Sequence, residues 1–195
     1  MVWLRVCCSR PSRSWGLSPL NIDETTFWLG QLFPKPPIFD EARNIGMVAL
    51  EDNQVLGVTR TFAEVDTGLE AIEEGLPVRS EIVSVARATP EQMAGALEAA
   101  VDKLRSTGGI IPAQPGTLLP QLLDQEDLSV QHGLFVPPYL WGGETPRVTE
   151  PDRLTVLLQL VMLTDAEYAY AIEEGVGSLQ QALVEAEIDL LDWRR

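Results

Sequence analysis

Apolar positions in the first part of the chain predict one short helix and one hairpin. Asn21 or Asp23 is a capping candidate before a short apolar run that ends at "PKPP", as expected for a helix stopped by prolines. Two apolar runs then flank "EDNQ", where Asp52 and Asn53 tolerate the backbone angles of a tight turn, so we expect a β-hairpin. Residues 63–77 show little periodicity and are expected to form a loop or a single helical turn.

The clearest signals lie in the middle of the chain, where a strand is followed by a helix. Residues 78–87, "VRSEIVSVAR", are rich in β-branched side chains and predict the strand. Thr89 is a capping residue, Pro90 suits the first helical position, and Gln92 completes a capping box. Apolar residues then repeat at helical spacing up to a glycine pair, which predicts a helix over 90–106.

Prolines interrupt the pattern in the next part of the chain. Residues 110–129 hold three prolines and are expected to be irregular, with a short strand at residues 110–111. The proline pair at 137–138 argues against a central strand in the aromatic stretch 130–141.

The C-terminal part reads as one strand and two helices. Residues 153–163, "RLTVLLQLVML", form a near-continuous apolar run, as expected for a strand buried on both faces. Thr164 and Glu167 form a second capping box, which opens a helix that ends at Gly175. A final helix is expected over 178–191, with four side chains turned inward: Leu179, Leu183, Ala186 and Leu190.

This order of elements predicts an α+β fold, a mixed β-sheet flanked by helices. A length of 195 residues suits one domain, which we place at residues 21–195. Residues 1–20 are expected to be a disordered tail or the product of an upstream start codon.

Charge narrows the set of partners. The chain carries 29 acidic and 14 basic residues, a net charge of −15. Residues 1–20 hold three arginines and no acid, so the remaining 175 residues have 11 basic and 29 acidic groups, a net charge of −18. Such a body repels phosphate backbones, which argues against nucleic-acid binding. The acidity suits a basic protein partner, and it also serves solubility alone.

The cysteines indicate a cytoplasmic setting. Cys7 and Cys8 are adjacent, and two cysteines are too few for a disulfide framework or a zinc site. The N-terminal stretch lacks the apolar run of a signal peptide, and no window of about 18 apolar residues would span a membrane. We expect neither a membrane anchor nor a cofactor.

Catalytic motifs are hard to find. Asp165 and Glu167 fall in the first turn of a predicted helix, where the helix dipole stabilises negative charge, and Glu173 and Glu174 point about 100° apart. His132 is the only histidine, and no nucleophile elbow, metal-ligand spacing or phosphate-binding loop accompanies it. The sequence favours a hydrogen-bonded loop histidine, and the alternative is a small hydrolase that uses His132 and a carboxylate.

Five stretches together resemble the bacterial suppressor of fused domain family. They are "GVTRTF", "VRSEIVSVAR" before a capped helix, "GGIIPAQPGTLL", "HGLFVPPYLW", and an apolar strand that runs into "LTDAEYAYAIEEGVGSL". The likeness covers roughly residues 44–187 and is strongest from His132 onward. It rests on order and spacing, because no single stretch is as specific as a zinc or phosphate signature.

The resemblance implies a protein-binding module without enzyme activity. Animal members hold a transcription factor in the cytoplasm, and bacterial members are proposed to be immunity proteins that neutralise toxins. This chain lacks a counterpart to the additional C-terminal region of the animal proteins, so we expect the bacterial role. Aromatic side chains favour interfaces, and they more often fill cores. The expected partner contacts combine them with the histidine and two nearby acids: His132, Phe135, Tyr139, Trp141, Glu126 and Asp127.

Overall fold

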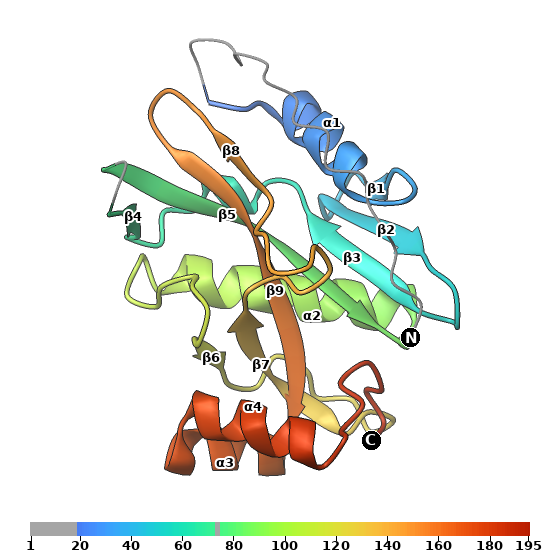
Figure 1. The fold of residues 1–195 in the computed structure, drawn as a ribbon. Coiled ribbons are helices and arrows are strands. Elements are labelled where there is room, and N and C mark those ends of the chain that lie inside the picture. The colour runs from blue at the N-terminus through green and yellow to red at the C-terminus, as the bar shows by residue number, and fades with distance from the viewer. Residues whose placement is uncertain (1–18, 73–74) are drawn as a thin grey trace.

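The computed structural model describes residues 19–72 and 75–195 (Figure 1). Within them, nine strands form one sheet in the order β1-β2-β3-β5-β9-β7-β6, with β4 beside β5 and β8 beside β9. Predictions for residues 1–18 lie outside the described residues. The strands are β1 (Ile38–Asp40), β2 (Ile45–Ala49), β3 (Val55–Thr59), β4 (Glu70–Ala71), β5 (Leu76–Ala86), β6 (Leu118–Leu119), β7 (Val130–Val136), β8 (Arg147–Thr149) and β9 (Leu154–Thr164).

In the described part of the chain, four α-helices cover the two faces of this sheet. They are α1 (Ile22–Leu32), α2 (Pro90–Ser106), α3 (Asp165–Glu174) and α4 (Val176–Glu185), and a short 3-10 helix, η1, spans Phe62–Glu64. The central strands β5 and β9 are parallel, whereas the other described pairs are antiparallel. A parallel pair needs a crossover connection, and that connection contains α2, which lies behind the sheet in Figure 1.

Alternating residues of β9 separate three hydrophobic clusters. Leu158 and its even-numbered neighbours pack with α2 on one face. Leu157 packs with α1 on the other face, while Val161 and Leu163 pack with α3 and α4. The period of two explains why "RLTVLLQLVML" is almost continuously apolar, because both faces of the strand are covered.

Most elements predicted from the sequence are confirmed. The mixed sheet flanked by helices is present, and α2 has the predicted bounds 90–106 with a complete capping box at Thr89. Asn21 caps α1, and Thr164 and Glu167 form the capping box of α3. Residues 63–77, expected as a loop or a helical turn, contain most of η1 and the short β4.

The strand expected at residues 110–111 is wrong. Gly108 and Gly109 both adopt positive φ, and the backbone N–H of Ile110 donates to Thr107 O in a turn. The strand in this region is instead β6, at Leu118–Leu119. Ile110 is 84% exposed, so its apolar character does not reflect pairing within a sheet.

The expectation that the 130–141 stretch is no central strand is also wrong. β7 pairs with β9 on one side and with β6 on the other, so it is an internal strand. The prolines at 137–138 follow its last residue, Val136, and therefore remove no hydrogen bond from the ladder.

The final helix begins two residues earlier and ends six residues earlier than expected. Glu187 adopts a φ of 50°, and the N–H of Ile188 donates to Leu183 O, which is the Schellman pattern of a helix end. Leu179 and Leu183 are buried as predicted, whereas Ala186 is exposed and Leu190 half-buried.

Gly57 of β3 gives a direct test of the packing between the sheet and α2. A Cβ atom there would lie 2.5 Å from Cγ of Met93 and 2.8 Å from Cδ1 of Leu97. We expect Gly57→Ala to lower the free energy of unfolding by about 1–3 kcal/mol in urea titrations, because the overpacked side chains must shift. Gly30→Ala in α1 is the control, since nothing lies within 4 Å of its added Cβ. A Gly57→Ala variant as stable as Gly30→Ala would contradict this packing.

Candidate functional site

His132 is buried in β7 with both ring nitrogens bonded. Its Nδ1 accepts a hydrogen bond from the backbone N–H of Gln121 at 3.1 Å. Nε2 therefore carries the proton and donates to Oδ1 of Asp165 at 2.7 Å. The ring also stacks on Tyr168, with centroids 4.1 Å apart. The residue thus ties β7 to the first turn of α3.

This arrangement bears on the alternative hydrolase, which needs a histidine nitrogen facing a substrate. The structure does pair His132 with a carboxylate, that of Asp165, but the remaining nitrogen is occupied by the backbone of Gln121. The ring is 7% exposed. The geometry therefore favours a structural histidine over a general base.

Replacing His132 is expected to cost stability. His132→Ala removes two hydrogen bonds and the stack on Tyr168, so we expect the free energy of unfolding to fall by about 2 kcal/mol. Asp165→Asn is the control, because an amide oxygen can still accept from Nε2 and the Asp165 side chain is 72% exposed. Urea unfolding measures the free energy of unfolding of both variants. An equal decrease in His132→Ala and Asp165→Asn would contradict the structural role given to the imidazole.

The three aromatic residues expected to contact a partner have different environments. Phe135 is fully buried against the α2 side of the sheet and offers no surface. Trp141 is half-buried and packs on Phe33 at the end of α1, with ring centroids 5.9 Å apart. Tyr139 is 49% exposed, and its backbone N–H donates to Oε1 of Gln159 at 3.2 Å.

The two acids predicted beside these aromatics lie elsewhere. Glu126 and Asp127 are exposed, and Oδ2 of Asp127 accepts from Nε2 of Gln92 at 2.8 Å in the first turn of α2. Since α2 covers the face of the sheet opposite to Phe33 and α1, the structure does not bring this acidic pair together with Trp141.

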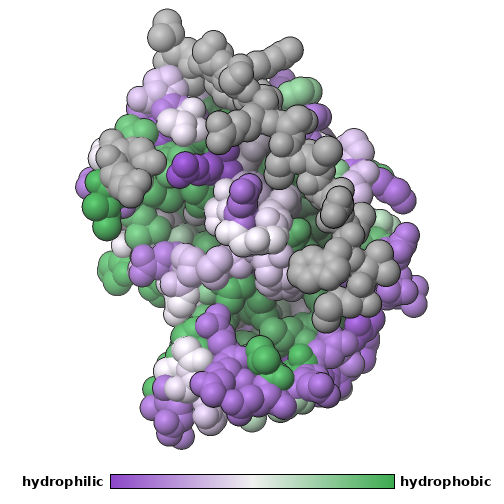
Figure 2. Space-filling model, viewed as in Figure 1, coloured by the Kyte–Doolittle hydropathy of each residue, from purple (hydrophilic) through white to green (hydrophobic). Residues whose placement is uncertain are grey.

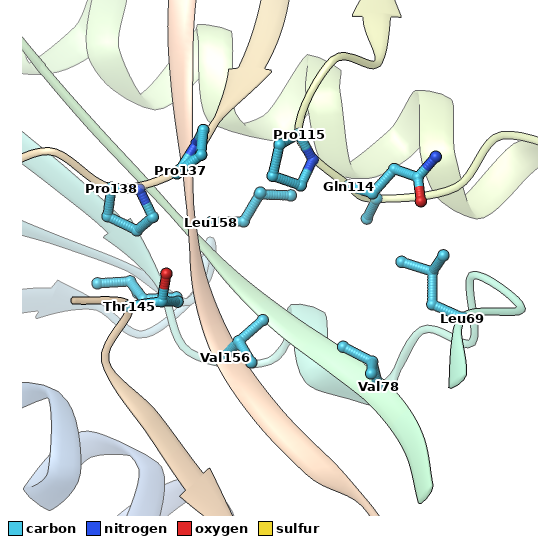
Figure 3. A pocket seen from close by; sticks show the side chains of 11 residues that line it. Leu69, Val78, Gln114, Pro115, Pro137, Pro138, Thr145, Val156 and Leu158 are labelled. Carbon is cyan, nitrogen blue, oxygen red and sulfur yellow. The ribbon is translucent and has the colours of Figure 1, made fainter. Parts of the chain in front are cut away.

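An apolar pocket lies where β7 ends and β8 begins along β9 (Figure 3). Its volume is about 220 Å³, and Gln114 and Thr145 are the polar residues of its lining. In the close-up, Pro115, Pro137 and Pro138 lie on one side and Val78 on the other. Its lining comes from distant parts of the chain: Leu69, Val78, Ala113, Gln114, Pro115, Pro137, Pro138, Thr145, Val156, Leu157 and Leu158.

Exposed apolar and acidic residues neighbour this pocket. Ile72 is 100% exposed and follows β4, which pairs with the start of β5. Ile110 is 84% exposed and follows Gly109, whose added Cβ would meet the backbone at Gly68, next to the pocket residue Leu69. Figure 2 shows hydrophobic surface at this side of the molecule, where Figure 1 has β4 and the loop after α2. Three exposed carboxylates lie on the connection between β3 and β5: Glu64, Asp66 and Glu70.

Sequence reasoning missed a buried carboxylate, Glu81 of β5. It accepts hydrogen bonds from Oγ1 of Thr59 at 2.5 Å and from the backbone N–H groups of Phe62 and Ala63, both at 3.1 Å. Burial raises the pKa of Glu81 to about 7, outweighing the hydrogen bonds that lower it. The signal was in the sequence, since Glu81 is the one acid of the predicted strand "VRSEIVSVAR" and directly precedes its β-branched residues.

Neither a metal cluster nor a membrane helix is found in the described residues. Within 19–72 and 75–195, no group of three or more His, Cys, Asp or Glu side chains is placed to hold a metal ion. No helix in these ranges is long and apolar enough to cross a bilayer.

Three solved structures share this architecture. A SUFU (suppressor of fused protein) homologue from Neisseria gonorrhoeae FA 1090 has a TM-score of 0.54 at 18% identity, covering 81% of each chain. The structure of the Sufu–Fu complex has a TM-score of 0.59 at 15% identity, covering 89% of this chain and 90% of that chain. Drosophila Suppressor of Fused has a TM-score of 0.53 at 14% identity, covering 77% of this chain and 42% of that chain. The chain therefore has the suppressor-of-fused fold, which confirms the resemblance at the level of the fold.

One relative is similar in sequence along most of its length. The immunity protein YqcF of Bacillus subtilis (strain 168) is 23% identical over 176 residues, which cover 86% of this chain and 91% of that protein. No protein-family model matches the chain.

Proposed function

We propose that this chain is a protein-binding module that acts by masking the surface of a basic protein toxin. The similarity to an immunity protein carries the proposal, because it spans 86% of this chain and 91% of YqcF and so covers the whole β-sheet. The suppressor-of-fused fold supports a binding role, since one of its solved examples is a complex of Sufu with Fu.

The distribution of charge supports a basic partner. Residues 164–192 carry eight acids and no basic residue. In Figure 2, hydrophilic surface lines the lower edge of the molecule, over α3 and α4. Complementary potentials speed association and suppress wrong partners. Since acidity also serves solubility, the salt dependence of binding has to separate the two explanations.

Masking needs exposed side chains rather than a catalytic centre. Of the residues expected to touch a partner, Tyr139, Glu126 and Asp127 have the exposure that contact requires, and we keep these three as proposed contacts. The cytoplasm remains the proposed compartment, and masking requires no cofactor.

The full chain, used as bait in a lysate of its host at low and at high salt, tests this function. We expect capture of one basic protein at low salt and its loss at high salt, because screening weakens interactions between exposed charges. The captured protein should then arrest growth when it is expressed alone. Absence of a partner at both salt concentrations, or capture of a harmless protein, would contradict the proposal.

A further inference from the structure

The apolar pocket and its rim form a surface that the sequence did not predict. By the rim we mean the exposed residues Ile72, Ile110, Glu64 and Glu70. We propose that this surface anchors the partner by taking one large apolar side chain, Leu- or Phe-like, from a basic segment of that protein. This inference rests on the proposed function and deepens it, because it names the site of contact and the kind of residues that the site binds.

The size of the pocket favours a single side chain. Its volume of about 220 Å³ lies below the roughly 300–1,000 Å³ of pockets that hold small molecules. A pocket of this size suits one inserted side chain better than a whole small molecule.

The lining of the pocket suits an apolar occupant. Val156 and Leu158 of β9 and Val78 of β5 present branched aliphatic groups, and three prolines frame them (Figure 3). Proline side chains lose little conformational entropy when a partner packs against them. An anchor that fills such a pocket is the usual energetic centre of a protein interface.

The rim adds both apolar area and negative charge. Ile72 follows β4, and Ile110 follows Gly109, which lies against the backbone next to the lining residue Leu69; both isoleucines are almost fully exposed and offer apolar area to a partner. Glu64 of η1 and Glu70 of β4 lie with Asp66 on the connection between β3 and β5. Of the basic residues in this region, Arg79 is paired with Asp66 at 2.8 Å, and Arg147 lies on β8 opposite the lining residue Val156, so the acids outnumber the bases. The local charge therefore favours basic residues on either side of the inserted side chain.

Short peptides test the pocket without the resident partner. The probes are acetylated and amidated pentapeptides Lys-Gly-X-Gly-Lys, in which X is Phe, Leu or Ala, titrated into the full chain and followed by amide NMR signals. We expect the Phe and Leu peptides to shift the signals of Leu69, Val78 and Gln114. They should bind about tenfold or more tightly than the Ala peptide, because only they bury a large side chain.

Matched variants separate the pocket from the rest of the surface. Val156→Phe, which fills the pocket, should abolish the preference for Phe and Leu over Ala. Glu64→Lys with Glu70→Lys should weaken all three peptides about threefold or more. The control pair Glu51→Lys with Glu173→Lys, equal in charge but on the β2–β3 turn and on α3, should leave binding unchanged.

Three outcomes would overturn the inference: no shift of the pocket signals at millimolar peptide, equal affinity of the Ala and Phe peptides, or equal weakening by the two charge pairs. The peptides do not depend on the resident partner. Failure to capture a partner from the host lysate would therefore contradict the proposed function alone. Absence of NMR shifts at the pocket residues would contradict this binding site alone.

Discussion

The free energy of unfolding of this protein is expected to fall by about 3 kcal/mol between pH 4.5 and pH 7 through the titration of Glu81 alone. Its pKa is raised from 4.5 to about 7 in the folded chain, first because of burial and further because of the nearby Glu64 carboxylate. The folded chain therefore binds this proton more tightly than the unfolded chain does. The resulting stabilisation is fully present below pH 4.5 and is lost as the pH rises through 7.

The measurement is the difference between wild type and Glu81→Gln in urea unfolding at pH 5, 6, 7 and 8. Glu81→Gln cannot titrate, so the difference should change by about 3 kcal/mol across the series, while Glu51→Gln at an exposed turn should follow wild type. Because other groups contribute equally to wild type and variant, they cancel in the difference. A difference that stays constant with pH would show that Glu81 is not buried as described.

A second buried carboxylate, that of Glu150, is expected to be important for stability, because it connects the start of α1 to the loop between β8 and β9. Its side chain accepts hydrogen bonds from the backbone N–H of Leu20 at 2.6 Å, from Oγ1 of Thr155 at 2.5 Å and from Nε of Arg153 at 3.0 Å. Glu150→Ala leaves these donors without their acceptor and removes the carboxylate that pairs with the largely buried guanidinium of Arg153. We expect a loss of about 3 kcal/mol in the free energy of unfolding.

Asp152→Ala is the matched control, since it removes an exposed carboxylate from the same turn and should cost less than about 0.5 kcal/mol. Hydrogen exchange adds a local readout. In Glu150→Ala the amide of Leu20 should exchange faster, because its acceptor is gone, whereas amides in α2 should change only as global stability falls. The account of this contact would fail if Glu150→Ala and Asp152→Ala had equal stabilities.

Local signals made α2 and β9 predictable. The capping box at Thr89, the helical spacing and the closing glycines act within the helix itself, so its bounds were right. The apolar run of β9 reflects burial on both faces, which the sequence records directly.

The two main errors have different causes, one between distant segments and one local. Pro137 ends β7 but does not prevent it from pairing on both sides, because sheet position depends on β6 and β9. The early end of α4 depends on a positive φ at Glu187. Glycine normally occupies this position at a helix end, so the sequence carried no sign of the stop.

The candidate site was predictable only in part. His132 stood out as the only histidine, but its role depends on Gln121 and Asp165, which the fold brings to its two nitrogens. The pocket was not predictable, because its lining is drawn from six separate parts of the chain and no periodicity connects them. Burial of Phe135 likewise follows from sheet pairing rather than from the aromatic cluster in the sequence.

The most direct test of the central claim is a growth measurement in a bacterial host that expresses the basic protein captured by the full chain. We predict that the captured protein alone stops growth and that co-expression of this chain restores it. Rescue should be weaker with Ile72→Ser and Ile110→Ser together than with the control pair Ile38→Ser and Val184→Ser, which are also exposed but lie on β1 and α4. Growth arrest that persists with the wild-type chain present would contradict the account.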